Sequence, residues 1–381
     1  MLRWFKHWAV ISRLVGIYLA VSLPSALAAD PPAQSGEPLT PDQAIAKGIH
    51  YLRVKGQNDD GSYSKTGGPG YTALATMAIL RNGVSVDDPQ VAKALKYLET
   101  FVQPDGSISS PKPGFSNYET SLSLACFALA NRDGRYKKII DDASTYLKKV
   151  QLDEGEKRTP ESVDYGGAGY NSKTPGGDLS NTATMLEALK AAGAGSSDEA
   201  MQRAKIFVSR CQNLETEHNL LPFAAKINDG GFLYSPNGPG YSPAGKAPNG
   251  GLRSYGSMTY AGLKSLLYAG VTADDPRVKA ATKWLRMHYT MDENPGLGQE
   301  GLYYYYSLMA KALDAVGSPE FEDAAGKKHD WRAELAAALI KRQGEDGSWI
   351  NSNRRWYEGN PDLATSYALL ALSYCRKPAK P

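Results

Sequence analysis

The sequence predicts an all-α protein: a single closed (α/α)6 toroid of six helical hairpins, with an inner and an outer ring of helices. Amphipathic helical patterns alternate along the chain with patterns that are apolar nearly all round. A short polar turn recurs between them, most clearly from Gln343 to Trp349 and from Gln57 to Tyr63, and more weakly from Gln103 to Ile108. The last apolar helix lacks the polar face that caps an open array of repeats, so it needs the first hairpin as a partner.

The N-terminal segment lies outside this pattern. Arg3, Lys6 and Arg13 precede a short apolar run over residues 14–23, and a small-residue cleavage site ends at Ala28. These are the parts of a secretory signal peptide, and the run is too short for a stable membrane span. We therefore expect export to the periplasm or the extracellular space. The expected segments are a signal peptide (1–28), a flexible linker (29–40), one toroid domain (41–376) and a tail (377–381).

Composition limits the possible partners. The 381 residues are 42% hydrophobic and 22% charged, which is typical of a globular domain with a large core. A net charge of +3 is too small to favour nucleic acid. Cys126, Cys211 and Cys375 each lie in an apolar helical pattern, which favours buried free thiols, although a disulfide between two of them is left open.

The outer helices have one apolar face. In the second, Asp88 and Pro89 suit the N-cap and the first turn, and Val91, Leu95 and Leu98 share a face. The outer helices are expected near 41–54, from 88 onward, and near 136–150, 198–211, 276–287 and 330–342.

The inner helices are apolar on every side, which indicates burial all round. They are expected over 71–80, 118–130, 180–192, 255–269, 302–316 and 363–374. Several stop at a glycine that suits the C-terminal cap: Gly83, Gly193, Gly270 and Gly317. Five carry a threonine near the start: Thr72, Thr120, Thr182, Thr259 and Thr365. Because all six should share a direction, their N-termini should meet at one rim around a central cavity.

The recurring turn carries a family resemblance. Gln343 to Trp349, read with its extra Asp346, resembles the QW motif of squalene–hopene cyclases and related terpenoid cyclases. From Pro41 to Tyr374 the chain resembles prenyltransferase/squalene oxidase repeat proteins, whose α/α toroid is shared with protein prenyltransferase β subunits. The resemblance implies that these turns tie neighbouring hairpins together, with structural roles for Gln57, Tyr63, Gln343 and Trp349.

The chain departs from the catalytic motifs of those relatives. Where bacterial triterpene cyclases have Asp-x-Asp-Asp, this chain keeps only Asp178, followed by Leu179, Ser180 and Asn181. The Asp-x-Cys pair of zinc-binding prenyltransferases is absent, and the histidines show no paired metal-ligand spacing. We therefore expect no cofactor and no metal, and whether the chain is an enzyme stays open.

Two carboxylates are catalytic candidates. Asp178 and Glu119 lie at or near the start of inner helices, so both should face the rim. The simpler explanation of Asp178 is an N-cap, and that of Glu119 is a favourable interaction with the helix dipole. As a general acid, either would need a pKa raised by burial.

Aromatic residues are the ligand-binding candidates. Tyr303, Tyr304, Tyr305 and Tyr306 sweep about 300° of a helix, so at least one should reach the cavity. Aromatic faces stabilise carbocations and stack on sugars, although tight packing explains such a run as well. Tyr255, Tyr260, Arg253 and Glu300 are further candidates near inner helix starts. The long loops 153–177 and 228–251 should cover the same rim.

These observations support three hypotheses. The leading one is a terpenoid cyclase-like toroid that acts on or binds an isoprenoid or other largely apolar ligand. The alternatives are a carbohydrate-active toroid, such as a polysaccharide lyase or hydrolase, and a scaffold that has lost catalysis. A deep apolar pocket would favour the first, an open groove with polar groups between rings the second, and a filled lumen the third. The oligomeric state is not predicted.

Overall fold

The computed structural model describes residues 39–64, 67–111, 114–171 and 176–376. The expected signal peptide, the tail and nearly all of the linker lie outside these residues. Thr40, placed at the end of the linker from sequence, caps the first helix by accepting a hydrogen bond from the backbone N–H of Gln43. The first helix of the toroid therefore starts at Pro41, with Thr40 as its N-cap.

The expected helices are present in the expected order. The outer helices are α1 (Pro41–Tyr51, extended by a π-helical turn over Leu52–Gly56), α3 (Pro89–Glu99), α5 (Lys137–Lys149), α7 (Glu199–Arg210), α10 (Pro276–Met287) and α12 (Trp331–Lys341). The inner helices are α2 (Gly68–Arg81), α4 (Ser116–Ala130), α6 (Leu179–Ala191), α9 (Gly256–Tyr268), α11 (Leu302–Val316) and α13 (Pro361–Cys375). The structure adds a short helix, α8 (Pro222–Ile227), and a hairpin of β1 (Phe321–Glu322) and β2 (Lys328–His329).

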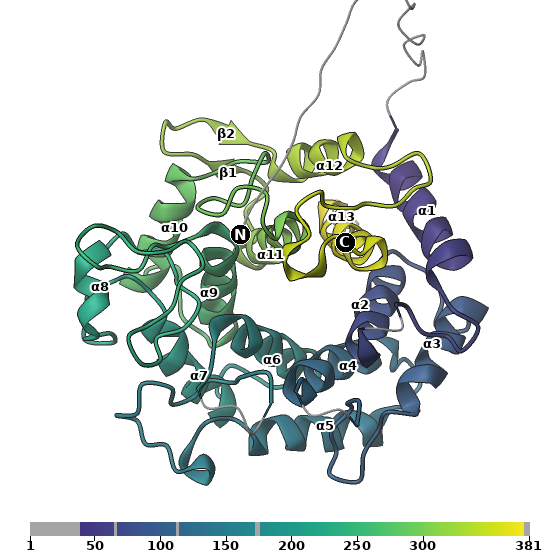
Figure 1. Ribbon diagram of the computed structural model, residues 1–381, viewed down its shortest axis with the longest axis horizontal. Coiled ribbons are helices and arrows are strands. Elements are labelled where there is room, and N and C mark those ends of the chain that lie inside the picture. Colours follow the sequence, from purple (N-terminus) through teal and green to yellow (C-terminus); the bar gives the residue numbers. More distant parts are fainter. Residues whose placement is uncertain (1–38, 65–66, 112–113, 172–175, 377–381) are drawn as a thin grey trace, which may run out of the picture. The chain divides into compact units, whose positions relative to one another are not determined.

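The inner helices form a closed ring. Each packs against the next in chain order, and α13 packs against α2 (Figure 1). The first outer helix, α1, contacts both α12 and α13, which joins the two ends of the domain. Closure gives the apolar α13 a neighbour on both sides, as the sequence requires.

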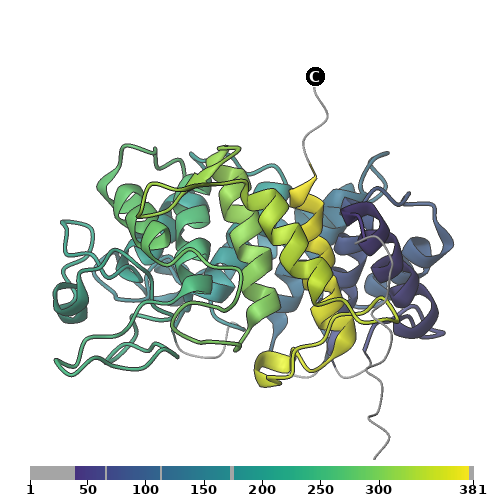
Figure 2. The ribbon, with the colours of Figure 1, turned by 90° about the horizontal axis from the view of Figure 1, so that it is seen from above.

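The side view shows the helices running between two rims, where the connecting loops collect (Figure 2). No helix in the described part of the chain combines the length and the hydrophobicity needed to cross a bilayer. Cys126, Cys211 and Cys375 are free thiols, and the first two are buried.

Glutamine side chains brace neighbouring hairpins on the outside of the ring. The Gln57 amide donates to the carbonyl of Gln90 on α3 (2.8 Å), and the Gln343 amide donates to the carbonyl of Ala44 on α1 (2.9 Å). The second bond closes the ring across almost the whole length of the domain.

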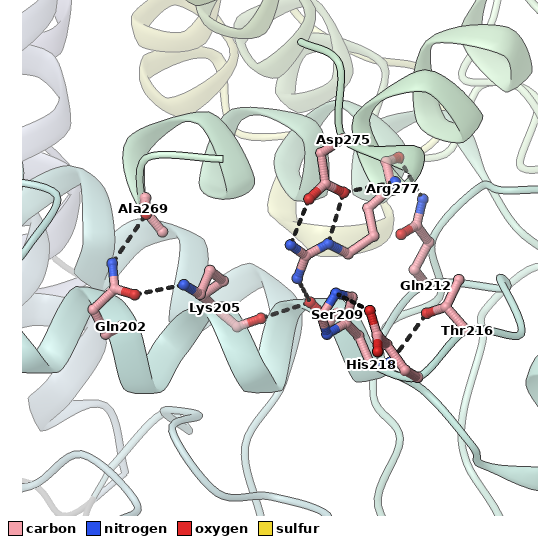
Figure 3. A network of polar contacts seen from close by, with 10 residues as sticks. Gln202, Lys205, Ser209, Gln212, Thr216, His218, Ala269, Asp275 and Arg277 are labelled. Atoms are coloured by element: carbon pink, nitrogen blue, oxygen red, sulfur yellow. Dashed lines mark hydrogen bonds and ion pairs between the residues drawn. The ribbon is translucent and has the colours of Figure 1, made fainter. Parts of the chain in front are cut away.

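Two more braces escaped detection from sequence. Gln151 donates to the carbonyl of Ala200 (3.0 Å), and Gln212 donates to the carbonyl of Arg277 (2.9 Å). Figure 3 shows Gln212 beside Arg277, whose side chain pairs with Asp275. The glutamine also bonds a glycine carbonyl, as in the short turns, but here a long loop separates the two residues: Gln151 from Gly166, and Gln212 from Gly230. The short sequence motif is therefore interrupted.

The repeated threonines fix the inner helices to these turns. Thr72 accepts a hydrogen bond from the backbone N–H of Tyr63 (3.0 Å), and Thr365 accepts one from Trp349 (2.9 Å). Ile108, Ala168 and Phe232 make the same bond to Thr120, Thr182 and Thr259. The repeated threonine therefore fixes how each inner helix is placed along the turn that precedes it.

Candidate functional site at the mouth of the ring

The rim at which the inner helices begin, here called the mouth, is built by loops that reach over the neighbouring helix. The amide of Asn117 on α4 donates to the carbonyl of Tyr170, and the amide of Leu179 on α6 donates to the carbonyl of Tyr234 (2.8 Å). On α11 the amide of Tyr304 donates to the carboxylate of Glu358 (2.7 Å). These contacts satisfy helix-terminal N–H groups and hold the loop aromatics over the ring.

Tyrosines from several hairpins meet at the mouth. The rings of Tyr118 and Tyr170 lie 6.0 Å apart, and those of Tyr304 and Tyr367 lie 5.5 Å apart. The Tyr118 and Tyr367 hydroxyl groups are hydrogen bonded, and the Tyr234 and Tyr170 hydroxyl groups lie 3.5 Å apart. The cluster thus joins α4, α11, α13 and the loops before α6 and α9.

Several large aromatic side chains in the loops around the mouth are exposed to solvent. Tyr357 and Tyr241 are 73% and 52% exposed, and Trp356 and Tyr170 are 40% and 37% exposed. Phe115, at the start of α4, packs edge-on against Tyr170 with 5.3 Å between the ring centres. Exposed rings gathered around one opening are typical of a ligand-binding surface.

Asp178 caps α6 beneath this aromatic cluster. One carboxylate oxygen accepts the backbone N–H of Asn181 (2.8 Å), and the other accepts its side-chain amide (2.7 Å). Burial raises the pKa of Asp178 to about 6, although the bonds from Asn181 and from the Tyr234 hydroxyl oppose the rise. The residue therefore combines the capping role with the raised pKa that a general acid requires.

Glu119 occupies a separate position at the mouth. Its carboxylate accepts the backbone N–H of Ser110 (2.9 Å) and the Ser110 hydroxyl. Burial also raises the pKa of Glu119, against these hydrogen bonds. The contacts described for Asp178 and Glu119 share no partner, so the two carboxyls do not form a directly coupled pair.

The four consecutive tyrosines divide between the lumen and the outer layer. Tyr304 lines the central cavity, and its hydroxyl lies 2.8 Å from that of Ser180. Tyr305 and Tyr306 donate to the carbonyls of Thr290 and Met291, and Tyr303 lines a surface groove with Arg342 and Arg354. Only Tyr304 of this run therefore reaches the cavity.

The remaining sequence candidates lie outside the cavity lining. Tyr255 is buried at the start of α9, near enough to Tyr304 and Asp178 to interact electrostatically. Tyr260 is buried against Tyr305, with 5.7 Å between ring centres. Arg253 is exposed, and Glu300 pairs with Arg355 (3.3 Å).

The lumen below the mouth is almost filled by side chains. Its cavity has a volume of about 30 Å³, the space open to the centre of a water molecule. Apolar residues such as Leu74, Met77 and Leu122 form part of the wall, together with Tyr118, Tyr304 and Tyr367.

The lumen also contains a buried charge cluster. Glu187 on α6 accepts hydrogen bonds from Lys264 on α9 (2.5 Å) and Lys311 on α11 (2.6 Å). Burial by itself would raise the pKa of Glu187, but the two ammonium groups outweigh it and hold that pKa well below its usual range. Burial lowers the pKa of Lys311, although the Glu187 carboxylate opposes this.

A sequence signal for this cluster existed. Glu187 and Lys264 each lie five residues after a repeat threonine (182 to 187, 259 to 264), and Lys311 lies five after Tyr306. Met77 and Ala125 hold the same register after Thr72 and Thr120, and all five residues line the cavity. A charged residue at this position of an otherwise apolar helix predicts a charge in the lumen.

Solved structures of other proteins resemble this chain in fold, although its sequence has no recognised relative in the two other comparisons. No protein-family model matches the chain, and no curated protein matches it. The type II terpene cyclase MstE from Scytonema, solved in complex with merosterolic acid A, is similar with a TM-score of 0.55 and 14% identity, over 88% of this chain and 96% of that chain.

Two solved structures with glycoside hydrolase names are similar to a comparable degree. A possible member of the GH105 family from Salmonella enterica has a TM-score of 0.50 and 12% identity, over 94% of this chain and 98% of that chain. A glycosyl hydrolase family 88 protein from Bacteroides vulgatus has a TM-score of 0.51 and 9% identity, over 87% and 98%. The fold is an α/α toroid. At these identities the likeness describes the fold alone, so function must be argued from this chain's own residues.

Proposed function

We propose that the mature chain is an exported toroid that binds an oligosaccharide at the mouth of the ring. The observation that carries this proposal is the set of exposed aromatic rings in the loops over the starts of the inner helices, with the buried carboxyl groups of Asp178, Glu119 and Glu358 close to those starts. Aromatic faces stack on sugar rings, and the polar groups between them suit sugar hydroxyls.

The nearly filled lumen argues against the isoprenoid hypothesis and is what the scaffold hypothesis expects, so the proposal of a sugar site rests on the mouth. Pockets for drug-sized ligands are commonly about 300–1,000 Å³. The central cavity has about 30 Å³ open to the centre of a water molecule, and three charged side chains form part of its wall. A long apolar chain would have to displace the wall and lie against the buried charges of Glu187, Lys264 and Lys311, at a high desolvation cost. The mouth is the better candidate because it needs no such rearrangement.

The carboxyl groups at the mouth support a polar ligand. Burial raises the pKa values of Asp178 and Asp362 to about 6 and also raises those of Glu119 and Glu358. Several perturbed carboxyl groups at one opening favour a functional site. If the bound sugar is also cleaved, Asp178 is the general acid we assign, because it lies beneath the aromatic cluster.

The test is direct binding of defined oligosaccharides. We expect calorimetry with a panel of neutral and acidic oligosaccharides to detect at least one ligand. The double variant Tyr170→Ala/Tyr357→Ala should weaken its binding at least tenfold. Stacking of a nucleobase on an aromatic side chain contributes about 1–3 kcal/mol, and a tenfold loss requires only the lower end of that range from the two rings together.

A matched control removes an exposed apolar side chain away from the mouth. Val316, at the C-terminal end of α11 and therefore at the opposite rim, is 44% exposed, and Val316→Ser should leave the affinity unchanged. An equal loss in both variants, or a co-purifying prenyl lipid in native mass spectrometry with no sugar bound by the panel, would refute the assignment of a sugar site.

A further inference from the structure

The charge cluster in the lumen has more positive than negative charge. Lys264 and Lys311 share one carboxylate, that of Glu187, with N–O distances of 2.5 and 2.6 Å. Lys264 is 1% exposed, and the Lys311 side chain is 10% exposed. With both lysines charged, one positive charge is left uncompensated inside the ring.

The surrounding elements do not supply the missing negative charge. Arg81 on α2 interacts electrostatically with Lys311 and adds a further cation, its guanidinium lying 4.0 Å from the centre of the Tyr374 ring. Asp314 on α11 is already paired with Arg332 (2.9 Å). Within the described part of the chain, Glu187 is the only carboxylate bonded to either lumen lysine.

An uncompensated buried charge is costly. Even after relaxation, removing one ion from water costs several kcal/mol, which an opposite charge offsets only at close range. Each ammonium group has three N–H donors, and the bonds to Glu187 use one from each lysine. Donors are therefore available for a second anion.

The cavity beside the lysines has the size and lining for a small anion. Both lysines line it, with the hydroxyl-bearing residues Ser121, Thr184 and Ser307. A water-sized particle needs about 10–15 Å³ of space for its centre, and the cavity offers about 30 Å³. A halide, as a single atom, is the anion that comes nearest to this size, whereas a sugar acid or a sulfate-bearing ligand is too large.

We infer that the lumen binds one small monovalent anion of halide size between Lys264 and Lys311, and that this anion stabilises the closed ring. The site lies deeper than the proposed sugar site at the mouth, and Tyr118, Tyr304 and Tyr367 lie between the two. The anion supplies the charge that Glu187 alone does not, and it holds α9 and α11 against α6.

The experiment measures thermal unfolding of the full domain in sodium chloride and in sodium gluconate at equal ionic strength, which equalises screening of surface charges. Gluconate is too large for the cavity. We expect Tm to be higher in chloride by about 2 °C or more. Equal Tm values in the two salts would overturn the inference.

Two variants of opposite sign sharpen the test. Lys311→Met leaves a neutral Glu187–Lys264 pair, so the difference between the salts should disappear. Glu187→Gln leaves two lysines with no carboxylate, so the difference should grow. Lys190→Met is the control, since Lys190 is exposed on α6 with its ammonium 4.9 Å from the Tyr268 ring, and it should retain the wild-type difference. A chloride effect that survives Lys311→Met would place the anion elsewhere.

A second measurement covers the case in which Glu187→Gln does not fold. Crystals of the wild-type domain grown in bromide should show one anomalous scattering peak in the lumen between the two ammonium groups. Crystals of Lys311→Met should lack it. A wild-type lumen without a bromide peak would contradict the inference.

Discussion

The glutamine braces on the outside and the charge cluster in the lumen both hold the six hairpins in a ring, but by different interactions. At the braces the recurring contacts are short, neutral and directional: a glutamine amide is bonded to the next hairpin, and a glycine packs against the backbone of that hairpin. In the lumen the inner helices are joined by charges withdrawn from water. The braces depend on shape and tolerate salt and pH, whereas the lumen and the mouth depend on ionisation.

The largest expected effect comes from breaking the lumen cluster. Glu187→Gln removes the carboxylate that bonds both lysines and leaves two cations buried side by side. Leaving a buried charge unpaired costs about 3–5 kcal/mol, so the free energy of unfolding in urea should fall by that amount. A fall of less than about 1 kcal/mol would show that water reaches the lysines freely.

The next effect tests the braces. Gly347 has φ of +88°, and a Cβ there would lie 2.5 Å from the carbonyl oxygen of Lys47 on α1. Gly347→Ala should therefore cost about 3 kcal/mol or more, from backbone strain and a collision with backbone that cannot move aside. Gly83→Ala measures the backbone strain without the collision, because Gly83 has φ of +91° and nothing lies within 4 Å of its Cβ position. It should cost about 1 kcal/mol, and equal losses would mean that the close approach to α1 contributes nothing.

A smaller effect, of opposite sign, is expected at the mouth. The pKa of Asp178 is raised from 3.8 to about 6, so the folded state holds its proton more tightly than the unfolded state. The stability due to this group is present below about pH 4 and is lost as the pH rises through about 6. Asp178→Asn keeps an N-cap side chain and should remove this loss. At pH 7.5 the variant should be more stable than wild type by up to about 3 kcal/mol, with little difference at pH 4.

The control for this change is Asp330→Asn, at the exposed N-cap of α12. In denaturant unfolding from pH 4 to 8, the difference in free energy of unfolding between Asp330→Asn and wild type should not change with pH in this way. If Asp178→Asn were instead destabilising at pH 7.5, the carboxylate would be charged and acting as a cap alone, and its assignment as a general acid would fall.

The smallest effect on stability is expected at the exposed aromatic side chains. Tyr357→Ala removes a ring that is 73% exposed, so the free energy of unfolding should change by less than about 0.5 kcal/mol. Affinity for the sugar found by calorimetry should nevertheless fall several-fold. A large loss of stability would indicate that Tyr357 serves to close the mouth.

Much of the scaffold was predictable because its determinants are local and repeated. Asp88 with Pro89, the glycines after the inner helices and the five threonines mark element ends within a few residues of chain. The hydrophobic pattern distinguishes the two kinds of helix. An outer helix is buried on one side and has one apolar face, whereas an inner helix is buried on all sides and is apolar all round. Even ring closure follows, since the apolar α13 has to be covered.

The site was less predictable because it joins residues that the chain keeps far apart. Tyr170 and Tyr357 lie in loops before α6 and α13, and only the folded mouth brings them near enough to interact electrostatically. Four adjacent tyrosines look alike in sequence, yet the rotation of α11 turns Tyr304 toward the lumen and Tyr305 and Tyr306 toward the outer layer.

By itself, then, the sequence determined the alternation of helices, their ends and the register of the repeat. Tertiary structure decided which register position faces inward, and so that Glu187, Lys264 and Lys311 meet in one cavity. It also decided how much space remains there. The physical reason is that propensity and periodicity act over a few residues, whereas the charge balance and volume of a lumen arise only when six helices are packed around it.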